Sequence, residues 1–183
     1  MSRVLLGHSY FLRFDPKLWQ AMQPYPPLGT LHAASVLRES GHDVRFFDAM
    51  LAESTAGWHW MLRNERPDIA VLFEDNFNYL SKMCLLRMRE AAFEMIGAAR
   101  DAGCRVIVCG ADVTDNAGDY LKHGASFALQ GEGEETLIEL LSALESGSDA
   151  YSIPGLSYLD EAGEVVTTGR RPVIRDLDSL PPA

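Results

Sequence analysis

Four short polar segments carry the residue types that could hold a ligand in this chain. One follows the apolar run that ends at Phe73 and contains two carboxylates and two amides. Others follow the runs that end at Cys109 and Gln130, and a fourth lies near the amino terminus. Carboxylates, amides and hydroxyls can hydrogen-bond a polar ligand. The candidate ligand-binding residues are Ser9, Tyr10, Glu74, Asp75, Asn76, Phe77, Asn78, Gly110, Ala111, Asp112, Gln130, Gly131, Glu132, Gly133, Glu134 and Thr136.

Glycines are prominent in two of these segments. Gly110 has no side chain, so a ligand could approach its backbone closely. Gly131 and Gly133 flank an expected helix start, where free N–H groups favour anionic or carbonyl-rich ligands. The neighbouring acids argue against simple phosphate binding, and the spacing is not that of a dinucleotide-binding loop. Capping of the following helices is the alternative role for several polar residues: Asn76, Asn78, Asp112 and Thr114.

Neither a catalytic centre nor a metal site is indicated by residue spacing. The sequence has no Cys-x-x-Cys pair, no Walker motif, no Gly-x-Ser-x-Gly elbow and no evident nucleophile–base pair. The histidines show no metal-ligand spacing and are expected to be packing or surface residues. By themselves the residues favour a ligand-binding domain over a complete enzyme, so we assign no catalytic residue and no metal ligand.

Five strands that alternate with helices are expected to position the polar segments. The predicted strands are 4–7, 43–48, 68–73, 104–109 and 125–130. The predicted helices are 28–39, 54–64, 78–101, one from 114 or 115 to about 123, and 134–144. Continuous apolar runs indicate strands buried on both faces. We therefore predict an α/β, flavodoxin-like (Rossmann-like) three-layer domain with a five-stranded parallel sheet of order 2-1-3-4-5, which binds ligands at the carboxyl ends of its strands.

Two regions depart from this alternation. Residues 8–27 form a long segment rich in aromatic residues and proline, which is either a lid or lining for a large apolar ligand or a packed excursion over the sheet edge. After Gly147, residues 155–168 predict a β-hairpin, and the proline-containing end has no periodicity. The expected organisation is a domain over 1–150, a hairpin extension over 151–169 and a linker over 170–183.

Composition narrows the class of partner. The chain has 183 residues, 47% of them hydrophobic, and a formal net charge of -10. Nucleic acid and membrane surfaces are not expected as partners, because binding to phosphates needs clustered Lys and Arg. No stretch approaches the roughly 20 apolar residues of a membrane helix. Three irregularly spaced cysteines, a first strand that starts at once and the absence of a signal peptide predict a cytoplasmic protein with reduced thiols.

Six segments of the chain carry short motifs whose order and spacing can be compared with those of known families. Residues 25–42 contain Pro-Pro-Leu-Gly, residues 109–112 read Cys-Gly-Ala-Asp, and residues 130–136 contain Gly-Glu-Gly-Glu. The others are 43–49, 153–158 and 175–181. In order and spacing they resemble the N-terminal cobalamin-binding domain of the cobalamin-dependent radical S-adenosylmethionine enzyme family, over essentially the whole chain. The turn at 130–136 is the most specific match, whereas Gly110 and Ala111 stand where the family usually has Gly-Gly.

The resemblance implies a domain that holds cobalamin against the carboxyl edge of its sheet. The nucleotide tail would lie beside the strands 104–109 and 125–130, and the candidate residues above would be the cofactor-binding set. The full-length enzyme, a methyltransferase type, would add a 4Fe-4S cluster and S-adenosylmethionine, held by a radical domain of the same polypeptide after the linker.

Two departures from related motifs limit this expectation. Asp-x-His-x-x-Gly is absent around His8, so we expect no histidine beneath the cobalt, where water or a side chain from 75–78 would lie instead. The cluster motif Cys-x-x-x-Cys-x-x-Cys is also absent, so the chain alone is expected to hold no iron–sulfur cluster and to perform no radical chemistry.

Two alternatives stay open at this point. A domain of the same shape that has lost the cofactor could serve as a substrate-recognition or docking scaffold, which the acids at 74–75 and the Gly-Ala turn favour slightly. A flavodoxin-like or receiver-like domain could bind a nucleotide or phosphate, although the acids at 132–135 and the lack of phosphate-loop hydroxyls after the first strand count against it.

Overall fold

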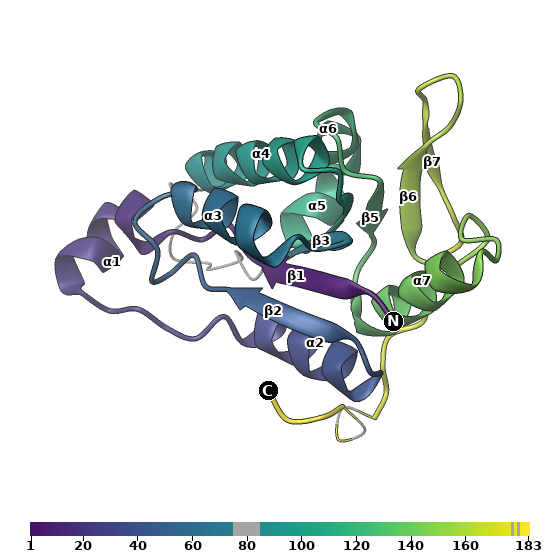
Figure 1. The fold of residues 1–183 in the computed structure, drawn as a ribbon, viewed down its shortest axis with the longest axis horizontal. Helices are drawn as coiled ribbons and strands as arrows, with labels where there is room; N and C mark the ends of the chain where they lie inside the picture. Colours follow the sequence, from purple (N-terminus) through teal and green to yellow (C-terminus); the bar gives the residue numbers. More distant parts are fainter. Residues whose placement is uncertain (75–84, 177, 179) are drawn as a thin grey trace.

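The computed structural model describes residues 1–74, 85–176, 178 and 180–183. Within these residues, seven strands form one sheet of order β2-β1-β3-β4-β5-β6-β7 (Figure 1). They are β1 (Arg3–Gly7), β2 (Asp43–Phe47), β3 (Ile69–Phe73), β4 (Arg105–Cys109), β5 (Phe127–Leu129), β6 (Leu156–Leu159) and β7 (Val165–Thr167). The strands β1 to β5 pair in parallel, whereas β6 and β7 are antiparallel. The expected mixed α/β class with a mostly parallel sheet is confirmed.

The prediction of a five-stranded sheet is wrong in its extent, because the expected hairpin joins the sheet. Strand β6 pairs with β5 at Ala128↔Ser157 and Leu129↔Leu156. Strand β5 is only three residues long, and an open strand edge leaves backbone N–H and C=O groups without partners. Addition of the hairpin satisfies these groups and moves the open edge of the sheet to β7.

Helices connect the parallel strands. They are η1 (Leu12–Phe14), α1 (Pro16–Ala21), α2 (Leu28–Glu39), α3 (Ala56–Glu65), α4 (Leu85–Asp101), α5 (Ala111–Asp115), α6 (Ala117–Lys122) and α7 (Glu134–Ser146). The bounds of α2 agree with those predicted, and the predicted start of α4 at Asn78 lies outside the described residues.

The prediction of a single helix that starts at Thr114 or Asp115 is wrong. Two short helices, α5 and α6, replace it, and the first begins at Ala111. Asn116 leaves the helical conformation between them, with φ −128° and ψ 31°. Its side-chain amide donates to the backbone carbonyl of Asp112 (3.0 Å), a local hydrogen bond that competes with continuation of the helix.

The central parallel strands are buried on both faces by helices, as their apolar runs predict. Alternate residues of β3 show this, because Ala70 and Leu72 join one core and Val71 and Phe73 join the other. The first core contains residues of α3, α4, α5 and α6, and the second contains residues of α2 and α7 (Figure 1). The two cores make the three layers of the domain, so the strand ends rather than the sheet faces are left for a ligand.

The segment 8–27 contains η1 and α1 and packs through its first part. Phe11 is fully buried in the first core, and Leu12 is 4% exposed. The Asp15 carboxylate accepts hydrogen bonds from the backbone N–H groups of Lys17 (3.0 Å) and Leu18 (3.1 Å), which caps α1. The first part of the segment is therefore a packed excursion, whereas Trp19 and Met22 lie on the surface.

The carboxy-terminal segment has no regular secondary structure over 168–176 and lies against the rest of the described chain. Arg171 forms ion pairs with Glu135 (3.6 Å) and Glu139 of α7. The Ser35 hydroxyl of α2 donates to the carbonyl of Pro182 (2.6 Å). The segment thus runs back along α7 toward α2 (Figure 1). No described helix has both the length and the apolar character needed to span a bilayer.

Trp58 of α3 offers a direct test of the first core. Its side chain is fully buried, and its indole N–H donates to the Met95 carbonyl (3.0 Å). We expect Trp58→Phe to lower the free energy of unfolding by about 1–3 kcal/mol, because it leaves a cavity and removes the donor. Trp60→Phe, at a residue that is 53% exposed, is the control and is expected to change stability by less than about 0.5 kcal/mol. Equal losses in urea unfolding followed by circular dichroism would contradict this packing.

Candidate functional site

Three strand ends are tied together at the carboxyl edge of the sheet by Glu74. This residue follows β3 and is 7% exposed. Its carboxylate accepts a hydrogen bond from the Ser9 N–H (2.9 Å) after β1, and its own N–H donates to the Cys109 carbonyl (2.8 Å) at the end of β4. The predicted residues Ser9 and Glu74 are therefore brought together, and they contact each other.

Tyr10 and Ser9 are turned into the protein in this conformation. Ser9 is fully buried and Tyr10 is 2% exposed. The Tyr10 hydroxyl donates to the Asp15 carboxylate (2.6 Å), and its N–H donates to His8 Nδ1 (3.2 Å). Neither residue lines an open surface here, so a role for them in binding a ligand stays a prediction.

The space opposite Gly110 is occupied by the chain itself. Gly110 has φ +142°, and a Cβ added to it would lie 2.8 Å from both Cβ and the carbonyl oxygen of Glu74. The close approach that we expected from a ligand is therefore made by the backbone of the neighbouring strand end. Glycine is needed at position 110 to let β4 and β3 end side by side.

Asp112 lies at the centre of a hydrogen-bonded network between α4, α5 and α6. It accepts two hydrogen bonds from Arg89 (2.7 and 2.5 Å) and one from the Tyr120 hydroxyl (2.7 Å). Burial alone would raise the pKa of this carboxyl, but the hydrogen bonds from Arg89 and Tyr120 outweigh it and hold the pKa below its ordinary value. Burial and nearby carboxylates raise the pKa of Tyr120. Asp112 is thus committed to internal contacts.

The turn before α7 combines tight packing with open space. A Cβ on Gly133 would lie 2.4 Å from Cys109 Sγ, so this glycine lets the start of α7 rest on β4. Gly131 has φ +71° and nothing within 4 Å of the position of a Cβ. Its N–H donates to the Thr114 hydroxyl (3.1 Å). Burial raises the pKa of the Cys109 thiol, which keeps it protonated and unreactive.

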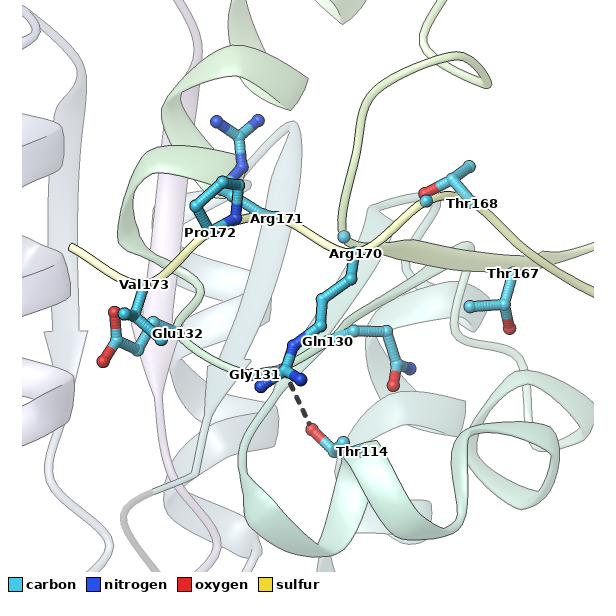
Figure 2. Close-up of a pocket in the computed structure, with 12 residues that line it drawn as sticks. Thr114, Gln130, Gly131, Glu132, Thr167, Thr168, Arg170, Arg171, Pro172 and Val173 are labelled. Carbon is cyan, nitrogen blue, oxygen red and sulfur yellow. Dashed lines mark hydrogen bonds between the residues drawn. The ribbon is translucent and has the colours of Figure 1, made fainter.

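A pocket of about 280 Å³ opens beside this turn (Figure 2). One side is formed by Thr114, Gln130, Gly131 and Glu132, and the other by Gly155 and the segment 167–173. The Thr136 hydroxyl lies next to Gly155, is buried and has no hydrogen-bond partner among the described residues. The pocket thus lies between the turn after β5 on one side and β7 with the segment that follows it on the other.

The candidate residues separate into four groups. Gln130, Gly131 and Glu132 line the pocket, whereas Ser9, Tyr10, Glu74, Gly110, Asp112 and Gly133 make internal contacts. Ala111 is exposed and Glu134 is half-buried, and Thr136 lies beside the pocket. Residues Asp75 to Asn78 lie outside the described residues.

The sequence reasoning missed the pocket-lining residues 167–173. They belong to the hairpin and to the segment interpreted as a linker, and no periodicity marks them. The adjacent cations Arg170 and Arg171 in an acidic chain were the available signal. Within the described residues, no three His, Cys, Asp or Glu side chains are grouped to hold a metal ion.

Two sequence relatives are methyltransferases. An uncharacterised methyltransferase of Pyrococcus horikoshii is 28% identical over 159 residues, which is 85% of this chain and 32% of the relative. The hopanoid C-3 methylase of Methylococcus capsulatus is 31% identical over 145 residues, 75% of this chain and 26% of the relative. The chain therefore spans about a third or less of these relatives. No protein-family model matches it.

Solved structures match almost the whole chain. The cobalamin-dependent S-adenosylmethionine radical enzyme OxsB, with aqua-cobalamin bound, superposes with a TM-score of 0.71 and 22% identity over 94% of this chain and 23% of that enzyme. The radical S-adenosylmethionine methyltransferase TsrM of Kitasatospora setae gives a TM-score of 0.71 and 20% identity over 91% of this chain and 30% of that enzyme. The chain has the fold of cobalamin-dependent S-adenosylmethionine radical enzymes. The resemblance inferred from its sequence motifs is confirmed.

Proposed function

We propose that the chain is the cobalamin-binding domain of a methyltransferase-type radical S-adenosylmethionine enzyme. The observation that carries the proposal is the fold match over 94% of the chain to an enzyme that holds aqua-cobalamin. The methyltransferase relatives support the reaction type. These comparisons give no support to a domain that has lost its cofactor.

The residues at the pocket fit one part of this cofactor. The pocket has a volume of about 280 Å³, close to the lower end of the roughly 300–1,000 Å³ range of small-molecule pockets, so it could take one part of a large cofactor, such as the nucleotide tail. Gly131 leaves open space beside its backbone, and the buried Thr136 hydroxyl lacks a partner among the described residues, as expected for a group that a ligand engages. Gln130, Gly131 and Thr136 would hold the tail, and the ring would lie over the strand ends.

When bound, cobalamin supplies a cobalt centre that carries the methyl group. His8 would not be available to bind this cofactor, because both of its ring nitrogens already have partners. His8 Nε2 lies 3.1 Å from Asp48 Oδ1, and Nδ1 accepts the Tyr10 N–H. Since Nδ1 is an acceptor, the proton resides on Nε2 and is donated to Asp48. We therefore propose that His8 does not bind the cobalt.

The remaining parts of the enzyme are proposed by analogy. A radical domain of the same polypeptide would hold S-adenosylmethionine and a 4Fe-4S cluster, and the segment 170–183 would lead into it. We place such an enzyme in the cytoplasm, with neither nucleic acid nor membrane as a partner. The division into a domain over 1–150 and a hairpin over 151–169 stays a proposal, although β6 and β7 belong to the same sheet as β1 to β5.

Uptake of hydroxocobalamin tests the proposal. The purified chain is mixed with excess cofactor and desalted, and the visible spectrum of the protein fraction is recorded. We expect near-stoichiometric corrinoid absorbance, with band positions that show no nitrogen ligand from the protein below the cobalt. A chain that elutes without corrinoid contradicts the proposed function.

Two leucine substitutions test where the cofactor binds. Gly131→Leu places a side chain in the open space of the pocket, and we expect it to lower corrinoid retention at least about tenfold. Gly41→Leu is the control, because Gly41 also has positive φ (+88°) and open space but lies after α2, away from the pocket. Retention that is equal in the two variants would show that the cofactor does not occupy this pocket.

A further inference from the structure

Arg170 points into the pocket from the segment that follows β7. Figure 2 shows its side chain extending across the pocket toward Gly131. Among the described residues, no hydrogen bond or ion pair involves its guanidinium group. Arg171, the next residue, is different, because it forms ion pairs with Glu135 (3.6 Å) and Glu139 on α7. Arg170 thus keeps its positive charge at the pocket, whereas Arg171 attaches the segment to α7.

The backbone around Arg170 is held on both sides. Before it, the Gly155 N–H donates to the Gly169 carbonyl (2.8 Å), and the Thr168 N–H donates to the Leu156 carbonyl (2.8 Å). After it, the Ile174 N–H donates to the Glu132 carboxylate (2.8 Å). A side chain on an anchored backbone loses less conformational freedom when it binds a ligand. The backbone of Arg170 is therefore held in place before any ligand arrives.

Other polar groups that line the pocket are used within the protein. The Thr114 hydroxyl donates to the Gly110 carbonyl (3.0 Å) and accepts the Gly131 N–H. The Glu132 carboxylate accepts the Ile174 N–H, and Gln130 Nε2 donates to the Ser157 hydroxyl (3.0 Å). Among the described residues, Arg170 is the cation of this pocket that no carboxylate neutralises. The group that it recognises should be an anion.

We propose that Arg170 binds a phosphate group in this pocket, and that the phosphodiester of the cobalamin nucleotide tail is its source. The proposal rests on the proposed function. A guanidinium group is planar and can donate two parallel hydrogen bonds to the two non-bridging oxygens of a phosphodiester. Arg170 would make the site selective for corrinoids that carry the nucleotide, and it would tie the segment after β7 to the bound cofactor.

Binding of two corrinoids to the full chain and its variants tests the proposal. Cobinamide lacks the nucleotide and its phosphodiester, so Arg170 should matter for cobalamin alone. We expect Arg170→Gln to weaken hydroxocobalamin binding at least about tenfold, the usual effect of losing a charged hydrogen-bonding partner. Cobinamide affinity should not change. Arg175→Gln is the matched control, since it removes the same charge from the same segment at an exposed residue outside the pocket.

The outcomes separate failure of this inference from failure of the proposed function. If the unaltered chain binds cobalamin and Arg170→Gln binds it equally well, or if both corrinoids weaken equally, the role of Arg170 is overturned and the function stands. If no corrinoid binds, the function is overturned. In that case, titration with inorganic phosphate followed by NMR tests the pocket alone. Shifts of the Gly131 and Arg170 amide resonances that are abolished by Arg170→Gln support a phosphate site whose ligand has another source. The absence of such shifts overturns the phosphate site.

Discussion

Replacing Gly110 with alanine should destabilise the chain by about 2–4 kcal/mol. Gly110 has φ +142° and ψ 170°, a backbone conformation that is essentially confined to glycine. The added methyl group would also lie 2.8 Å from Cβ and the carbonyl oxygen of Glu74. Because a backbone carbonyl at the end of a buried strand cannot move independently, the strain and the overlap should add.

Gly103→Ala is the control for this effect. Gly103 also has positive φ (+86°), but nothing lies within 4 Å of the position of its Cβ. This variant should lose only the conformational term, about 1 kcal/mol. Urea unfolding followed by circular dichroism measures both variants. If the two lose equal stability, the contact between the ends of β3 and β4 is looser than the structure indicates.

The second large effect is expected at Asp112. Asp112→Ala should lower the free energy of unfolding by about 2–4 kcal/mol at pH 7, because it leaves the Arg89 guanidinium and the Tyr120 hydroxyl without their acceptor. This loss lies toward the lower end of what breaking a buried ion pair usually costs, because the Arg89 side chain is 21% exposed and water can reach it. Asp115→Ala, in the same helix at an exposed carboxylate, is the control and should change stability by less than about 0.5 kcal/mol.

The stabilisation from Asp112 should depend on pH in one direction. The pKa of this carboxyl is lowered in the folded chain, so the unfolded chain binds the proton more tightly. The difference between the unaltered chain and Asp112→Ala should be complete well above about pH 4, the ordinary pKa of aspartate. It should shrink as the pH falls through the lower pKa of the folded state. A difference that grows on acidification would contradict the Arg89–Asp112 pairing.

These two positions show what local sequence patterns omit. The position of Gly110 and Asp112 after a buried strand predicts ligand contacts, but each instead has a partner within the chain. The partner of Gly110 is Glu74, just after the neighbouring strand β3, and the partner of Asp112 is Arg89, one helix earlier. Such pairings depend on strand register and on how helices pack, so residue type and spacing did not identify them.

Sequence patterns indicate one wall of the pocket and omit the other. The glycines and acids of the turn mark residues 130–132 as ligand-binding candidates, and these residues do line the pocket. The opposite wall, including Arg170, comes from a segment that has no periodicity. Its position depends on β6 pairing with the exposed edge of β5 and on the ion pairs of Arg171 with α7. Neither interaction can be inferred from that segment alone.

The sequence by itself determined the alternation of strands and helices, the burial of the sheet on both faces and the family whose fold the chain shares. These properties follow from local apolar patterns and short motifs, because burial favours apolar side chains wherever a strand or helix faces a core. Only the tertiary structure decided that the hairpin extends the sheet and that Glu74 fills the space at Gly110. It also decided that Arg170 faces a pocket, because contacts between residues far apart in the sequence arise only when the packed layers bring them together.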